Sequence, residues 1–152
     1  MTNVERIVND HVSVLGKKKE NLLPVLQKIV KSERYLSEEA MITVSREMGL
    51  SAAEIYGVAS FYSFLDIKPL GKNIIRICKT ITCDMKNKDE IISALEQRLK
   101  IKLGETTRDN KFSLLTANCM GWCHKGPAML INDRVYTELT PEKALKAIED
   151  YL

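Results

Sequence analysis

Four cysteines are the residues of this chain most able to do chemistry, and they occur as two pairs. The pairs are Cys78-x4-Cys83 and Cys119-x3-Cys123, and the chain has no other cysteine. Thiolates bind iron in iron–sulfur clusters, bind zinc in structural sites and form disulfides. A C-x4-C pair also opens the plant-type [2Fe–2S] pattern, so the spacing favours iron. Zinc, a disulfide and purely structural thiols stay open as alternatives.

Each cysteine pair follows a run with the composition of a β-strand. Residues 73–77 precede Cys78, and residues 112–118 precede Cys119. In open α/β sheets the crevice beyond the carboxyl ends of the strands is the usual ligand site. If the two loops lie side by side, their four thiols are expected to form one metal centre.

The composition of the 152-residue chain limits the other functional classes. Its length suits one ordinary domain, or one small domain with a helical extension. We find no leader pattern and no apolar run of membrane-spanning length, so we expect a cytoplasmic protein without direct membrane insertion. In that reducing setting, clustered thiols indicate metal or redox chemistry more often than disulfides. The net charge of +3 comes from interspersed charges, so nucleic acid is not an expected partner.

The elements that must position the cysteines fall into two predicted regions, residues 1–70 and residues 71–152. The boundary is indicated by Pro69 and Gly71, which interrupt the periodic pattern. Capping signals predict helices in the first region. The predicted N-caps, each with its helix, are Asn21 with 22–31, Ser37 with 38–48, and Ser51 with 55–64.

The second region alternates between the period of strands and the period of helices. Residues 89–101 have apolar side chains at the spacing of one helix face. Residues 128–131 and 135–139 flank a polar turn and predict a β-hairpin, and Thr140 is placed to cap a last helix. The predicted fold class is α/β, with an N-terminal helical bundle followed by a thioredoxin-like α/β domain that carries the metal centre.

Several short motifs in this order point to a known family. From about Asn21 to Leu152 the chain resembles the thioredoxin-like [2Fe–2S] ferredoxin that serves as the E-type subunit of NADH–quinone oxidoreductase. The same family supplies small subunits of NAD(P)-linked multisubunit hydrogenases and formate dehydrogenases. The resemblance rests on the four cysteines and on Leu23-Pro-Val-Leu-Gln27, Tyr35-Leu36, Tyr56-Gly-Val-Ala-Ser-Phe-Tyr62, Gly104-Glu-Thr-Thr107 and Leu139-Thr-Pro-Glu142.

The resemblance implies a non-catalytic redox subunit that is not a dehydrogenase by itself. The ligands of its one [2Fe–2S] cluster would be Cys78, Cys83, Cys119 and Cys123. Residues 1–70 would dock on a larger flavin- and NAD(P)-binding iron–sulfur subunit within a hetero-oligomeric complex, and FMN and NAD(P) would belong to that partner. The alternative is a zinc-stapled scaffold or interaction module without redox activity.

Side chains beside the cysteines are candidates for tuning the centre. Lys125 adjoins a ligand and is predicted to raise the reduction potential, because a cation favours the more negative reduced state. The hydroxyls of Thr80 and Thr82 are candidate donors to sulfur. Four cysteines already complete the site, so His124 is expected to be a neighbour and not a ligand. Trp122 is a candidate shield or partner contact.

Overall fold

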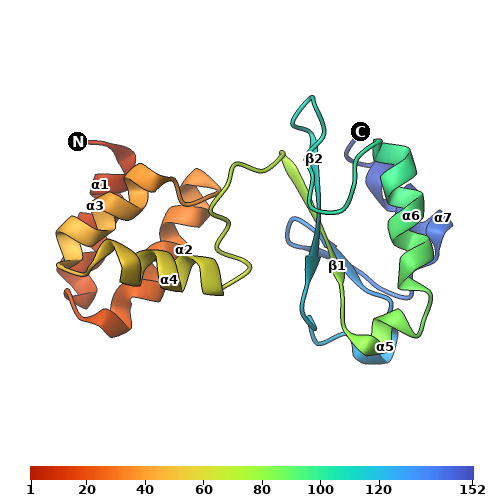
Figure 1. Cartoon of the computed structure of the whole chain (residues 1–152), viewed down its shortest axis with the longest axis horizontal. Helices are drawn as coiled ribbons and strands as arrows, with labels where there is room; N and C mark the ends of the chain where they lie inside the picture. Colours follow the sequence, from red (N-terminus) through yellow and green to blue (C-terminus); the bar gives the residue numbers. More distant parts are fainter. The chain divides into compact units, whose positions relative to one another are not determined.

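A computed structural model describes all residues, 1–152, and they form two compact units, Met1–Pro69 and Leu70–Leu152 (Figure 1). The first unit is entirely helical. Its elements are α1 (Asn3–Leu15), the 3₁₀ turn η1 (Lys19–Asn21), α2 (Leu22–Glu33), α3 (Glu38–Met48) and α4 (Ala52–Phe61). No helix of the chain combines the length and the apolar character needed to cross a bilayer.

The helical unit encloses its own apolar core. On α2 the buried residues Leu22, Leu26 and Ile29 recur at the spacing of one helix face. They belong to the same cluster as Val44 of α3 and Ile55 of α4, both fully buried. This unit therefore has a core of its own, as an independently packed helical bundle requires.

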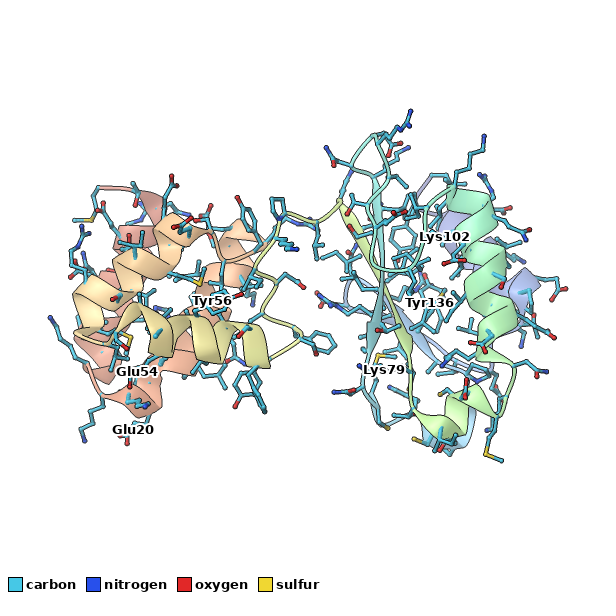
Figure 2. The ribbon with its side chains drawn as sticks, viewed as in Figure 1. Glu20, Glu54, Tyr56, Lys79, Lys102 and Tyr136 are labelled. Atoms are coloured by element: carbon cyan, nitrogen blue, oxygen red, sulfur yellow. The ribbon has the colours of Figure 1, made fainter.

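Two of the three predicted N-caps are confirmed. The Ser37 hydroxyl accepts a hydrogen bond from the Ala40 N–H, and α3 ends at Gly49 with φ 68°, a left-handed conformation that glycine adopts at low cost. Ser51 and Glu54 form the capping box of α4. The hydrogen bond from Lys19, followed by those from Ser51, lowers the pKa of Glu54 (labelled in Figure 2) to about 2. The Glu54 carboxylate of the capping box therefore stays ionised at ordinary pH.

The predicted cap at Asn21 is wrong. Its side chain makes no capping hydrogen bond to α2, and its amide instead donates to the carbonyls of Leu15 and Gly16 at the end of α1. The side chain thus satisfies two carbonyls that α1 leaves unpaired. The prediction for α4 also needs correction, because the helix ends at Phe61 and does not continue to Phe64.

The second unit is a four-stranded sheet with helices, as predicted for a thioredoxin-like α/β domain. Its strands follow the order β2-β1-β3-β4. The β1–β2 pair is parallel, whereas the β1–β3 and β3–β4 pairs are antiparallel. The elements are β1 (Asn73–Cys78), α5 (Ile81–Asp84), α6 (Lys88–Leu99), β2 (Phe112–Ala117), the 3₁₀ turn η2 (Cys123–Lys125), β3 (Met129–Ile131), β4 (Arg134–Tyr136) and α7 (Pro141–Glu149).

The sheet and two helices share the second core. Figure 1 shows α6 and α7 together on one face of the sheet. Ile77 of β1, Leu114 of β2 and Met129 of β3 are fully buried in the same cluster as Leu95 of α6 and Ile148 of α7. The predicted cap of α7 is confirmed by the hydrogen bond from the Lys143 N–H to Thr140. This packing fixes β1 as a central strand, and the first cysteine lies at its end.

Candidate metal centre

The first cysteine pair lies at the carboxyl end of β1. Cys78 is the last residue of that strand, and Cys83 lies in the four-residue helix α5. The N–H groups of Cys83 and Asp84 donate to the Thr80 carbonyl at 3.1 and 3.0 Å, which closes the turn between the two cysteines. Both cysteines are buried, with exposed fractions of 2% for Cys78 and 1% for Cys83.

The second pair lies in the loop after β2. Cys119 follows the end of the strand by two residues and is exposed, while Cys123 begins η2 and is half-buried. Their sulfur atoms are 3.1 Å apart. Gly121 has φ 84°, a conformation that L side chains rarely adopt, and its N–H donates to the Cys119 Sγ at 3.4 Å. Glycine therefore allows this loop to turn back on its own sulfur.

The two loops meet at one edge of the sheet. In the parallel β1–β2 ladder Cys78 is the register partner of Ala117, so both chains leave the sheet at the same level. The backbone of Met120, in the second loop, contributes to lowering the pKa of the Cys78 thiol in the first. The Lys86 Nζ, which follows α5, donates to the Cys123 carbonyl at 3.5 Å. All four predicted ligands are thus brought to the same edge.

Gly126 provides the space for the buried sulfur of Cys83. A Cβ at this position would lie 3.1 Å from the Cys83 Sγ, and its next contacts would be the Cys123 carbonyl and the Lys86 side chain. The φ of Gly126 is −71°, which any residue can adopt, so the requirement for glycine is one of space. Neither Lys86 nor Gly126 was singled out from the sequence, because both reach the site only through tertiary contacts.

The thiols influence one another's ionisation. Burial raises the pKa of Cys78, but hydrogen bonds from the Thr80 hydroxyl and N–H and from other neighbours outweigh it and leave that pKa lowered. Burial is also the largest influence on Cys83, and together with the neighbouring Cys78 it leaves that pKa raised. The hydrogen bond with Cys119, followed by burial and the charges of the other thiols, raises the pKa of Cys123. A metal cation relieves this mutual opposition between thiolates.

The donor set fits a two-iron centre better than a single ion. The Cys78 and Cys83 sulfurs interact as one pair, and the Cys119 and Cys123 sulfurs as another. A structural zinc takes all four ligands around one ion, whereas a [2Fe–2S] cluster distributes four thiolates over two irons. Two separate pairs match the second arrangement.

Apolar and basic side chains surround the cysteines on the exposed side. Ile81 and Met85 are 70% and 80% exposed, and Trp122 is 37% exposed. The Trp122 ring stacks on His124 with 5.9 Å between the ring centroids. The exposed Lys79, labelled in Figure 2, directly follows Cys78 at the end of β1. Large exposed apolar side chains beside exposed lysine are a surface suited to contact with another protein.

Comparison with known proteins relates this chain to a family of iron–sulfur proteins. A family model described as thioredoxin-like [2Fe-2S] ferredoxin matches residues 4–152. The E-type subunit of NADH-quinone oxidoreductase from Buchnera aphidicola subsp. Acyrthosiphon pisum (strain APS) is 42% identical over 125 residues, covering 82% of this chain and 77% of the relative. NADP-reducing hydrogenase subunit HndA of Solidesulfovibrio fructosivorans is 34% identical over 146 residues, covering 96% of this chain and 85% of the relative.

A solved structure shares the fold. The crystal structure of an NAD+-reducing [NiFe]-hydrogenase in the air-oxidized state matches 86% of this chain with a TM-score of 0.74 and 24% sequence identity. The match covers 22% of the hydrogenase chain, so this chain corresponds to a small part of that longer one. The likeness concerns the fold.

Proposed function

Because the chain belongs to the thioredoxin-like [2Fe-2S] ferredoxin family, we propose that it is the electron-transfer subunit of a multisubunit NAD(P)H-linked oxidoreductase. The observation that carries this proposal is the convergence of two cysteine pairs at one sheet edge. The proposed ligands of its one [2Fe–2S] cluster are Cys78, Cys83, Cys119 and Cys123.

The chain's own residues hold the centre and limit its contact with water. When bound, the cluster supplies a one-electron acceptor and donor. Cys78 and Cys83 are almost fully buried, which keeps their sulfurs away from solvent. Cys119 is exposed, so a partner protein could approach this side of the centre. The inner cysteines would thus protect the cluster from water, and the exposed outer pair would leave only a short distance for an electron to reach the protein surface.

The flavin and the nicotinamide nucleotide belong, in this proposal, to a larger partner subunit. The names of the relatives support such a complex, because one is a subunit of an NADH-quinone oxidoreductase and another a subunit of an NADP-reducing hydrogenase. The proposed setting is therefore an NADH:quinone oxidoreductase, an NAD(P)-linked or electron-bifurcating hydrogenase, or a formate dehydrogenase. In each of them this chain is a redox subunit and not the dehydrogenase itself.

We assign docking on this partner to residues 1–70. The support is a group of exposed aromatic side chains on α4 and in the segment that follows it, which are Tyr56, Phe61, Tyr62 and Phe64. The Phe61 and Tyr62 rings also meet edge to face, with centroids 5.0 Å apart. Exposed aromatic residues are enriched at protein interfaces, where their burial contributes much of the binding energy.

Affinity purification of the tagged chain from its native host, without oxygen, tests the proposal. We expect a flavin-containing iron–sulfur subunit to co-purify, and NADH or NADPH to reduce this chain's cluster in the complex but not in the isolated chain. Phe61→Ala should weaken the complex. Leu103→Ala is the control, because Leu103 is also an exposed apolar residue (39%) but lies outside residues 1–70. A preparation that contains no flavin, and in which neither NADH nor NADPH reduces the cluster, would contradict the proposal.

A further inference from the structure

Thr80 occupies a helix-capping position but uses its hydroxyl elsewhere. It precedes α5 with the extended backbone of an N-cap residue, φ −72° and ψ 156°, and its side chain makes no capping hydrogen bond. Threonine at this position usually accepts a hydrogen bond from an N–H of the first turn. The Thr80 Oγ1 instead lies 3.0 Å from the Cys78 Sγ. The hydroxyl is thus directed at a proposed cluster ligand.

The surrounding backbone holds this hydroxyl in place. The Thr80 carbonyl accepts hydrogen bonds from the N–H groups of Cys83 and Asp84, and these fix the residue at the start of α5. Cys78 is almost fully buried, so water does not compete freely for its sulfur. Thr82 lies on the same short helix and makes no hydrogen bond with a cysteine sulfur. Of the two threonines between Cys78 and Cys83, the structure singles out Thr80.

We propose that Thr80 is a positioning residue that orients the Cys78 thiolate and raises the reduction potential of the cluster. A thiolate bound to iron carries no proton, so in the loaded protein the hydroxyl must be the donor. Donation withdraws electron density from sulfur, which favours the more negative reduced cluster. Burial of the Cys78–Cys83 pair acts in the opposite direction, and Thr80 offsets part of it. This inference rests on the proposed [2Fe–2S] centre.

An anaerobic redox titration followed by EPR tests the role of Thr80. Thr80→Val keeps the shape and removes the hydroxyl, Thr80→Ser keeps the hydroxyl, and Thr82→Val is the matched control. We expect Thr80→Val to lower the equilibrium constant for one-electron reduction of the cluster by up to about tenfold. This corresponds to a midpoint potential lower by up to about 59 mV. Thr80→Ser and Thr82→Val should stay near the wild-type midpoint. An unchanged midpoint in Thr80→Val, or an equal shift in Thr82→Val, would overturn the proposal.

A second measurement covers the case in which Thr80→Val fails to assemble its cluster. Resonance Raman spectra of the wild-type protein in H₂O and D₂O are then compared with those of Thr80→Ala. We expect an iron–cysteine stretching band whose deuterium shift is reduced in Thr80→Ala, whereas an identical shift in both proteins would overturn the role of Thr80. If Thr80→Ala also lacks a cluster, only the wild-type protein is measured. An iron–cysteine band without any deuterium shift then overturns the role of Thr80, and a shifted band supports that role. A wild type without [2Fe–2S] signals refutes the proposed function itself.

Discussion

The two cysteine loops each position two thiols, but they differ in how far they bury them. The first loop buries Cys78 and Cys83, and the Thr80 hydroxyl lies within hydrogen-bond distance of the Cys78 sulfur. The second loop leaves Cys119 exposed and depends on the positive φ of Gly121 for its shape. We infer that the inner pair is built by folding, whereas the outer pair is completed by the metal and by a partner. In this account the inner pair contributes to the stability of the fold, and the outer pair faces the protein with which electrons are exchanged.

The largest effect should come from removing cysteines one at a time. Alanine at either Cys83 or Cys119 is expected to abolish the cluster, because one of the irons then loses a ligand. In the apoprotein the two variants should differ. Cys83→Ala leaves a small cavity and should cost about 1–2 kcal/mol of unfolding free energy, whereas Cys119→Ala should stay within about 0.5 kcal/mol. Iron analysis and urea unfolding provide the two measurements, and equal destabilisation would erase the distinction between the loops.

A smaller effect is expected from crowding the inner pair without removing a ligand. Gly126→Ala would place a Cβ 3.1 Å from the Cys83 Sγ, so the sulfur or the loop must shift. Overpacking of this kind is destabilising, so we expect a partial loss of iron, in contrast to the complete loss in the cysteine variants, and a broadened EPR signal. Gly57→Ala is the control, because its Cβ meets nothing within 4 Å. Full cluster loading in Gly126→Ala would show that the inner loop adapts more easily than its packing indicates.

Alkylation of the apoprotein compares all four thiols in one experiment. The exposed Cys119 should react with iodoacetamide first, and Cys78 and Cys83 should react at least about tenfold more slowly, because buried thiols are poorly accessible. Peptide mass spectrometry over a time course gives the order of modification. Early labelling of Cys83 would mean that the inner loop opens readily without its metal.

Local patterns predicted much of this architecture. Runs of apolar residues before Cys78 and Cys119 indicated strands, and the S-x-x-E pattern beginning at Ser51 indicated a capping box. These features depend only on neighbouring residues, which is why sequence alone revealed them. The cap predicted at Asn21 was wrong because its amide finds acceptors at the end of α1. Local spacing does not encode that choice.

The details of the site depended on contacts between distant segments. Gly126 has an ordinary φ, so no turn pattern marks it, and its role follows from its approach to Cys83. Lys86 likewise reaches the Cys123 carbonyl only because the two loops meet. Thr80 and Thr82 were equivalent candidates in the sequence, and the folded turn directs one hydroxyl to sulfur. The ligand assignment itself stays a prediction that requires a metal-loaded protein.

The smallest effect in this comparison concerns charge beside the outer pair. Lys125→Glu should lower the midpoint potential, because a negative charge near the cluster disfavours the added electron. The shift should shrink with added salt, since exposed charges are screened over about 10 Å at 0.1 M ionic strength. Lys146→Glu makes the same charge change on α7 and should shift the midpoint less. An unchanged or higher midpoint in Lys125→Glu would contradict this assignment.

The most direct test of the central claim is metal and sulfide analysis of the oxygen-free protein, combined with its EPR spectrum after dithionite reduction. The account predicts about two iron and about two sulfide per chain, and a rhombic S = 1/2 signal from the reduced protein. A colourless, EPR-silent protein with about one zinc per chain would contradict it. That result would indicate that the four cysteines bind a structural zinc in a scaffold protein without redox activity.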